Sequence, residues 1–100
     1  MGSTQHSITT AIYDIDRRLR EGALASARVA REPFRLGDEK QLLASLGALV
    51  DTVQQLADHL GPQIRSADSR GVLGQAAREL RDSARNLHKG ERNAPNADAS

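Results

Sequence analysis

The chain has 100 residues, a length that suits one domain with a modest core. Hydrophobic residues make up 38% of the chain but aromatic residues only 2%, which predicts an aliphatic core and argues against aromatic ligand pockets and base-stacking surfaces. The net charge of +1 is too small to imply a strongly polyanionic partner by itself. The absence of cysteine excludes disulfides, thiolate metal sites and cysteine nucleophiles, and it fits a cytoplasmic protein.

The sequence predicts no association with membranes. No apolar run approaches the length of a membrane span, and the first ten residues, MGSTQHSITT, lack the basic and apolar regions of a signal peptide. Alanine is abundant, and Lys40 and Lys89 are the only lysines beside many arginines. That usage is typical of bacterial genomes rich in G and C, so a bacterial source is expected.

The first predicted helix covers about residues 7–32, after a flexible N-terminus at residues 1–6. Ser7 is a candidate N-cap, because its hydroxyl can accept a hydrogen bond from an amide of the first turn. Pro33 predicts the end of the helix, because the residue before a proline is driven out of the helical region. Apolar residues recur at helical spacing through this segment, at Ile8, Ile12, Ile15, Leu19, Ala23, Ala27 and Ala30.

The second predicted helix covers about residues 39–60. Gly37 and Asp38 supply a turn followed by an N-cap residue. Gly61 is expected to adopt the left-handed conformation of a helix C-terminus, and Pro62 prevents the helix from continuing.

The apolar stripe of this second helix is wider than one packing seam needs. A second line, formed by Leu43, Val50 and Ala57, lies beside a first line with steps of four, three, four, three and four residues. The wide stripe has two explanations: a central element within a lone bundle, or an interface with a second copy of the chain. We favour the homodimer, since wide exposed apolar patches mark interfaces. The candidate interface residues are Leu42, Leu43, Leu46, Leu49, Val50, Val53, Leu56 and Leu60.

The third predicted helix covers about residues 69–89, with Asp68 or Ser69 as its cap. One long, kinked helix from Pro62 is the alternative. Residues 90–100 have almost nothing to bury and are expected to form a disordered tail. The predicted fold is therefore all-α: a three-helix, up-down-up antiparallel bundle that dimerises through its long central helix.

No arrangement of residues predicts catalysis, a metal site or a cofactor. His6, His59 and His88 lie far apart in the sequence, and no second histidine follows at the spacing that a helical metal site needs. Asp51 and Asp58, one heptad apart, have the pattern of solvated charges on the second helix. No glycine-rich phosphate loop is present. We therefore predict no catalytic, cofactor-binding or metal-binding residues.

Two short stretches resemble helical enzymes. The stretch IYDIDRRL, residues 12–19, resembles the opening of the all-helical chorismate mutases, but Ala25 stands where that family has an arginine. The stretch RDSARNLH, from Arg81 to His88, is similar to the arginine–histidine pattern of the helical ribonucleases that accompany minimal nucleotidyltransferases. In that family both residues act on the scissile phosphate.

The charges are distributed unevenly along the chain. Residues 38–60 carry one basic and four acidic residues, whereas residues 62–92 carry seven basic and four acidic ones. Four basic residues of the third helix advance by three or four positions and form one ridge: Arg78, Arg81, Arg85 and Lys89. The ridge is either a solvated face or a contact for phosphates or an acidic protein surface.

Together these features predict a small non-enzymatic protein-interaction module, which acts as an adaptor, assembly or regulatory component through homodimerisation and contacts with partner helices. The alternative is an accessory nucleic-acid-binding protein that uses the basic ridge. A third possibility is a helical enzyme of unrecognised type.

Overall fold

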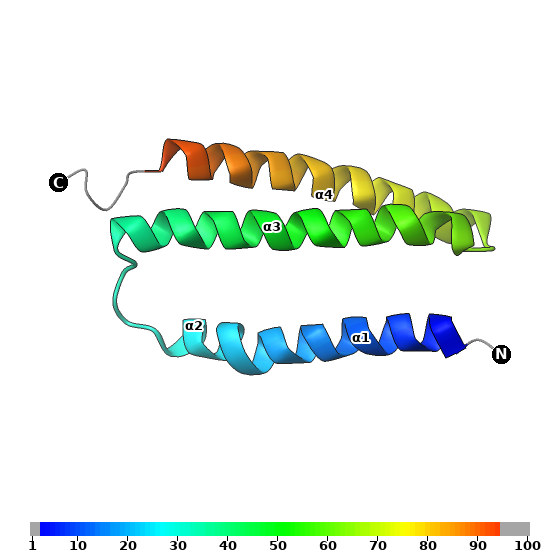
Figure 1. Ribbon diagram of the computed structural model, residues 1–100, viewed down its shortest axis with the longest axis horizontal. Coiled ribbons are helices and arrows are strands. Elements are labelled where there is room, and N and C mark those ends of the chain that lie inside the picture. Colours follow the sequence, from blue (N-terminus) through cyan, green and yellow to red (C-terminus); the bar gives the residue numbers. More distant parts are fainter. Residues whose placement is uncertain (1–2, 95–100) are drawn as a thin grey trace. The chain divides into compact units, whose positions relative to one another are not determined.

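A computed structural model describes residues 3–94, and these residues form helices and their connections with no strand. The prediction of an all-α protein is confirmed. The chain divides into two compact units, residues 1–33 and residues 34–100, which are described separately below (Figure 1).

The first unit is one run of helix. It consists of α1 (Ser3–Leu19), a π-helical turn, η1 (Arg20–Leu24), and α2 (Ala25–Val29). The expected cap at Ser7 is wrong, because nothing between Ser3 and Ser7 interrupts a helix and apolar spacing does not mark where one begins. Residues 3–6, predicted to be flexible, belong to α1. Residues 1 and 2 lie outside the described part of the chain.

The helix of the first unit ends at Val29, three residues before the predicted Glu32. Ala30 has an extended backbone, with ψ of 134°. Pro33 explains the early end, because it has no N–H group and cannot donate the hydrogen bond that the carbonyl of Val29 would accept within a continuing helix.

The second unit begins with α3 (Leu36–Leu60). The helix starts three residues before the predicted residue 39, and its cap residue is Arg35, with no side-chain hydrogen bond, instead of Asp38. Asp38 and Glu39 lie in the first turn, where their negative charges complement the positive end of the helix dipole.

The turn after α3 differs from the expected left-handed cap. Gly61 has a right-handed backbone, with φ of −49° and ψ of −52°, and opens the 3₁₀ turn η2 (Gly61–Gln63). Because the ring of Pro62 presets a φ value that suits a 3₁₀ turn, the chain stays right-handed past the end of α3. Ile64 is then extended, so the alternative of one long helix from Pro62 is wrong.

The last helix, α4 (Ala67–Asn93), begins two residues before the predicted Ser69. Its N-cap is Ser66, whose Oγ accepts a hydrogen bond from the backbone N–H of Ser69 at 3.3 Å. The helix continues through Gly90 to Asn93, four residues beyond the predicted end at residue 89 and into the segment predicted to be a disordered tail. Residues 95–100 of the predicted tail lie outside the described part of the chain.

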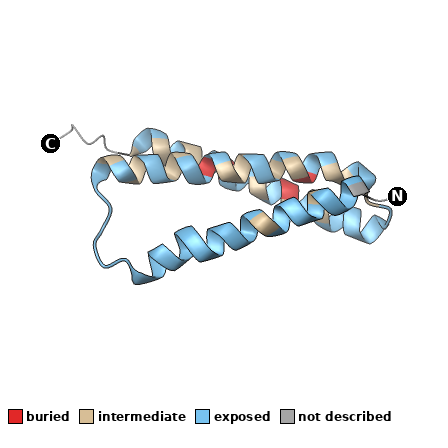
Figure 2. Cartoon of the chain, turned by 60° about the horizontal axis from the view of Figure 1, so that its bottom comes forward, coloured by how far each residue is buried: buried red, intermediate tan, exposed pale blue. Residues whose placement is uncertain are grey.

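Helices α3 and α4 form an antiparallel hairpin whose centre consists of small residues (Figure 1). Gly47 and Ala57 of α3 and Ala77 and Ala84 of α4 are buried (Figure 2), with Ala77 only 3% and Ala84 only 2% exposed. Among the described residues, no large side chain is fully buried. The two backbones therefore approach closely, and the core between them is thin.

The line of α3 that faces α4 is the second of the two predicted lines. Leu43 and Gly47 contact residues of α4, and Val50 and Ala57 continue the same face at helical spacing. The first line, from Leu42 to Leu60, lies to one side of this contact. The facing side of α3 is the one that carries its two small buried residues, Gly47 and Ala57.

The cap at Ser66 allows a direct test of the hairpin. Replacing Ser66 with Ala removes the acceptor for the Ser69 amide and should lower the free energy of unfolding by about 1 kcal/mol, measured by urea denaturation. The control is Ser69→Ala, which keeps that backbone hydrogen bond and should change stability much less. Equal losses in the two variants would contradict the assignment of Ser66 as the cap.

Candidate functional site

The hairpin has two flanks, which lie on either side of the α3–α4 contact. At about 100° per residue, Asp51 and Asp58 of α3 lie to one side of the contacting line, and the line that starts at Leu42 lies to the other. Arg81 and His88 of α4 bond to the two aspartates and so belong to the same side. We call this side the polar flank and the opposite side the apolar flank.

Gly47 of α3 lies against the imidazole ring of His88 of α4, on the edge of the polar flank. A Cβ atom placed on Gly47 would lie 2.9 Å from Cε1 of His88, which is nearer than real Cβ atoms come to a neighbour, and 3.1 Å from Nδ1. Nε2 of His88 donates a hydrogen bond to Oδ2 of Asp51 at 2.7 Å, and both side chains are partly buried. The imidazole ring is therefore held between a carboxylate and a bare Cα atom.

A second polar contact lies one heptad further along both helices. The guanidinium of Arg81 is 3.2 Å from Oδ2 of Asp58, and the amide of Gln54 donates to the same carboxylate oxygen. Both ionic side chains of the pair are about half exposed, so the ion pair contributes at most about 1 kcal/mol. The main effect of the ion pair is on the register of the two helices. Together with the pair Asp51–His88, one heptad away, it matches only one alignment of the antiparallel helices.

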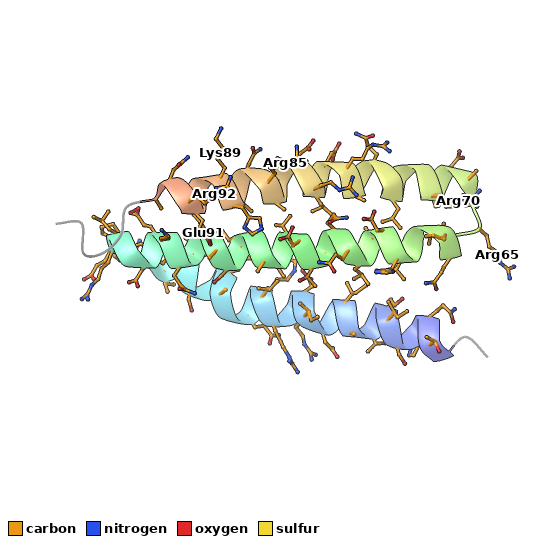
Figure 3. The ribbon with its side chains drawn as sticks, turned by 45° about the horizontal axis from the view of Figure 1, so that its top comes forward. Arg65, Arg70, Arg85, Lys89, Glu91 and Arg92 are labelled. Carbon is orange, nitrogen blue, oxygen red and sulfur yellow. The ribbon has the colours of Figure 1, made fainter. Side chains whose placement is uncertain are left out.

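The four residues of the predicted basic ridge all lie on α4, but their side chains make different polar contacts. Arg81 bonds across to Asp58, Arg85 forms an ion pair of 3.7 Å with Asp82, and Arg78 donates to the side-chain oxygen of Gln75 at 2.7 Å. Lys89 is exposed and points away from α3 (Figure 3). Two members of the ridge thus contact carboxylates, and two do not.

The apolar flank is formed by large side chains of α3 and by both large and small ones of α4. Leu42, Leu46 and Val53 are 37%, 40% and 41% exposed. Leu49, Leu56 and Leu60 of the same line are partly exposed. At helical spacing, the residues of α4 on this side are Val72, Ala76, Leu80, Ser83 and Leu87, and both leucines are partly exposed. The flank is therefore an apolar face to which both helices contribute large side chains.

The first half of α4 also borders two shallow, open depressions. They share Asp68, Val72 and Ala76, and Val72 is 71% exposed. Their walls carry few polar groups, unlike the enclosed, polar-tipped pockets that orient small ligands. They extend the apolar surface of the hairpin.

Within residues 3–94, no group of three or more histidine and acidic side chains is arranged to hold a metal ion. His6 and His59 are both exposed, on different helices. None of the helices in this range is long and apolar enough to cross a membrane.

No protein-family model matches the chain, and no curated protein or solved structure matches it either. The residues that resemble the helical ribonucleases, Arg81 and His88, are those that bond to Asp58 and Asp51.

The sequence did not predict the contact at Gly47 or the pairing of Asp51 with His88. The spacing of the aspartates led us to expect solvated charges. A signal was present: Asp51 and Asp58 are one heptad apart, and so are Arg81 and His88. Opposite charges at matching heptad intervals on two antiparallel helices indicate pairing across the contact.

The close contact predicts opposite effects for alanine at two glycines of the hairpin. Gly47→Ala should lower the free energy of unfolding by about 1 kcal/mol or more, because the new methyl group displaces the ring of His88. Gly74→Ala should raise it by up to about 1 kcal/mol, because nothing lies within 4 Å of that Cβ position and alanine favours the helix.

A double-mutant cycle separates the contact from the helix propensity. In a His88→Ala background the obstacle is gone, so Gly47→Ala should become stabilising, as Gly74→Ala is. The free energy of unfolding of the four variants, measured by urea denaturation, gives the coupling. A Gly47→Ala variant that is stabilised equally in both backgrounds would show that the two helices do not approach closely here.

Proposed function

We propose that this protein is a small, non-enzymatic helical association module that forms a homodimer through its apolar flank and acts as an adaptor, assembly or regulatory component. The observation that carries the proposal is the thinness of the core. In the described part of the chain the buried hydrophobic residues are Ala57, Ala77 and Ala84, while many large apolar side chains are exposed.

A core of alanines contributes little free energy. Ordering one residue costs about 1–2 kcal/mol of backbone entropy, whereas burying apolar surface returns about 25 cal/mol per Å², and alanine offers little surface. Helices in proteins are stabilised mainly by packing of an apolar face. A second surface that covers the leucines of the apolar flank would supply the missing burial.

The shape of the apolar flank suits a second copy of the same hairpin. Two hairpins related by a twofold axis parallel to the helices place the α3 of each against the α4 of the other, in antiparallel orientation. The row of α3 that includes Leu46 and Val53 then meets the row of α4 that includes Ala76 and Leu80. Over the roughly 27 Å from Leu42 to Leu60, each copy would cover the apolar side chains of the other.

A lone three-helix bundle, closed within one chain, is a competing way to cover the same flank. The first unit exposes its own apolar residues, among them Ile12, Ile15 and Leu19. A bundle closed within one chain would leave a monomer, so the mass of the particle in solution separates the two arrangements.

The proposal predicts the mass of the particle. At tens of micromolar, light scattering should give about twice the chain mass of 10.8 kDa. The double variant Leu46→Lys and Val53→Lys should shift the particle to the monomer mass, because two charges would be buried at the interface. Circular dichroism should show helix retained, since lysine is a good helix former and both side chains can reach solvent.

The matched control is the double variant Ala48→Lys and Gln55→Lys. It adds lysines to the same helix at the same seven-residue spacing, at exposed positions on the side away from the apolar flank. It should remain a dimer. A wild-type protein that stays monomeric at high concentration, or a control that dissociates equally, would overturn the homodimer.

A further inference from the structure

All the basic residues of α4 share one side of the helix. At about 100° per residue they fall within a sector of roughly 100°, and they extend over roughly 33 Å of a continuous helix. Asp68, Glu79 and Glu91 lie well outside the sector, and Asp82 lies beside its edge. We call this set the basic stripe, and its members are Arg70, Arg78, Arg81, Arg85, Lys89 and Arg92.

Most of the positive charge of the basic stripe is uncompensated. Within residues 3–94, only Arg81 and Arg85 of the stripe lie within ion-pair distance of a carboxylate. The partners of these two, Asp58 and Asp82, are themselves about half or more exposed. Ion pairs so open to water are weak, and they can be exchanged for an arriving phosphate at small cost.

The basic stripe is accessible because it lies away from the apolar flank. Arg85 and Lys89 point away from α3, and Arg70 lies near the turn at the other end of α4 (Figure 3). Arg81 bonds to Asp58 on the polar flank, which places the stripe on that side of the hairpin. A second copy bound at the apolar flank would therefore leave the stripe uncovered.

We propose that the basic stripe binds double-helical nucleic acid through its phosphates, without reading the bases. A duplex carries one negative charge per about 1.7 Å along its axis, and one turn of it is about 34–36 Å long, close to the length of the stripe. Five of the six basic residues are arginines, whose planar forks match phosphate oxygens. A short or flexible acidic peptide would engage only part of so long and rigid a row.

A duplex suits the stripe better than a single strand does. Single-stranded partners are held by aromatic side chains that stack on the bases, and α4 has no aromatic residue. Contacts to phosphates alone carry no sequence information, so the expected binding is non-specific and strongly dependent on salt.

The test is fluorescence anisotropy with a labelled duplex DNA of about 24 base pairs, titrated with the full chain from 50 to 300 mM salt. Wild-type protein should bind with an affinity that falls steeply with salt. The triple variant Arg78→Gln, Arg85→Gln and Lys89→Gln should bind at least about tenfold more weakly at 100 mM salt, and its log–log salt slope should flatten by roughly two to three units. Its helicity should persist, since glutamine is a good helix former.

The matched control is Arg18→Gln, Arg28→Gln and Arg31→Gln. It removes the same three charges from exposed positions outside α4, none of which is within ion-pair distance of a carboxylate among the described residues. It should change the affinity less than about twofold, and an unrelated duplex sequence should bind wild-type protein equally well.

Three results would overturn the proposal. One is a wild-type protein without salt-sensitive binding to the duplex. Another is a control triple variant that loses as much affinity as the stripe variant, since net charge alone would then explain the binding. The third is displacement of the duplex by poly-glutamate at equal charge concentration, which would assign the stripe to acidic polypeptides.

Discussion

The close approach of α3 and α4 at Gly47 is the constraint on which the rest of the hairpin depends. The glycine leaves room for the ring of His88 against α3, and any larger side chain at that position would displace the ring. The same approach requires small residues along the contact, and Ala57, Ala77 and Ala84 supply them. Other large side chains of α3, among them Leu42, Leu46 and Val53, lie on one flank of this contact.

Polar side chains determine the register in which α3 and α4 pack. Alanines alone would allow the two surfaces to slide past one another by a turn, because each turn presents a similar face. The bonds from His88 to Asp51 and from Arg81 to Asp58 match only one register, and both lie on the same side of the contact. A polar residue at one contact position selects a register at some cost in stability, and here two pairs separated by a heptad do so.

The sequence predicts the helices themselves more accurately than their ends and their faces. Apolar spacing located every helix, because that periodicity follows directly from 3.6 residues per turn. The early end at Val29 depends on a hydrogen bond that Pro33 fails to donate four residues later, and the start of α4 depends on Ser66, one of several candidate caps close together. The choice between the two lines of α3 depends on His88, forty-one residues beyond Gly47, and spacing along one helix carries no information about a distant partner.

The large apolar residues and the basic stripe lie on opposite flanks of the hairpin. The proposed dimer and the proposed binding of nucleic acid therefore do not compete for one surface. The basic residues of α4 all belong to the basic stripe, away from the apolar flank, so a second copy bound at that flank would not desolvate them. Asp51 and Asp58 hold the inner edge of the polar flank and compensate only the groups nearest the contact. A dimer joined through the apolar flank would thus carry two basic stripes on one rigid particle. Because the second stripe would bind the same duplex, or a neighbouring one, at a high effective concentration, association would strengthen phosphate binding without any new contact.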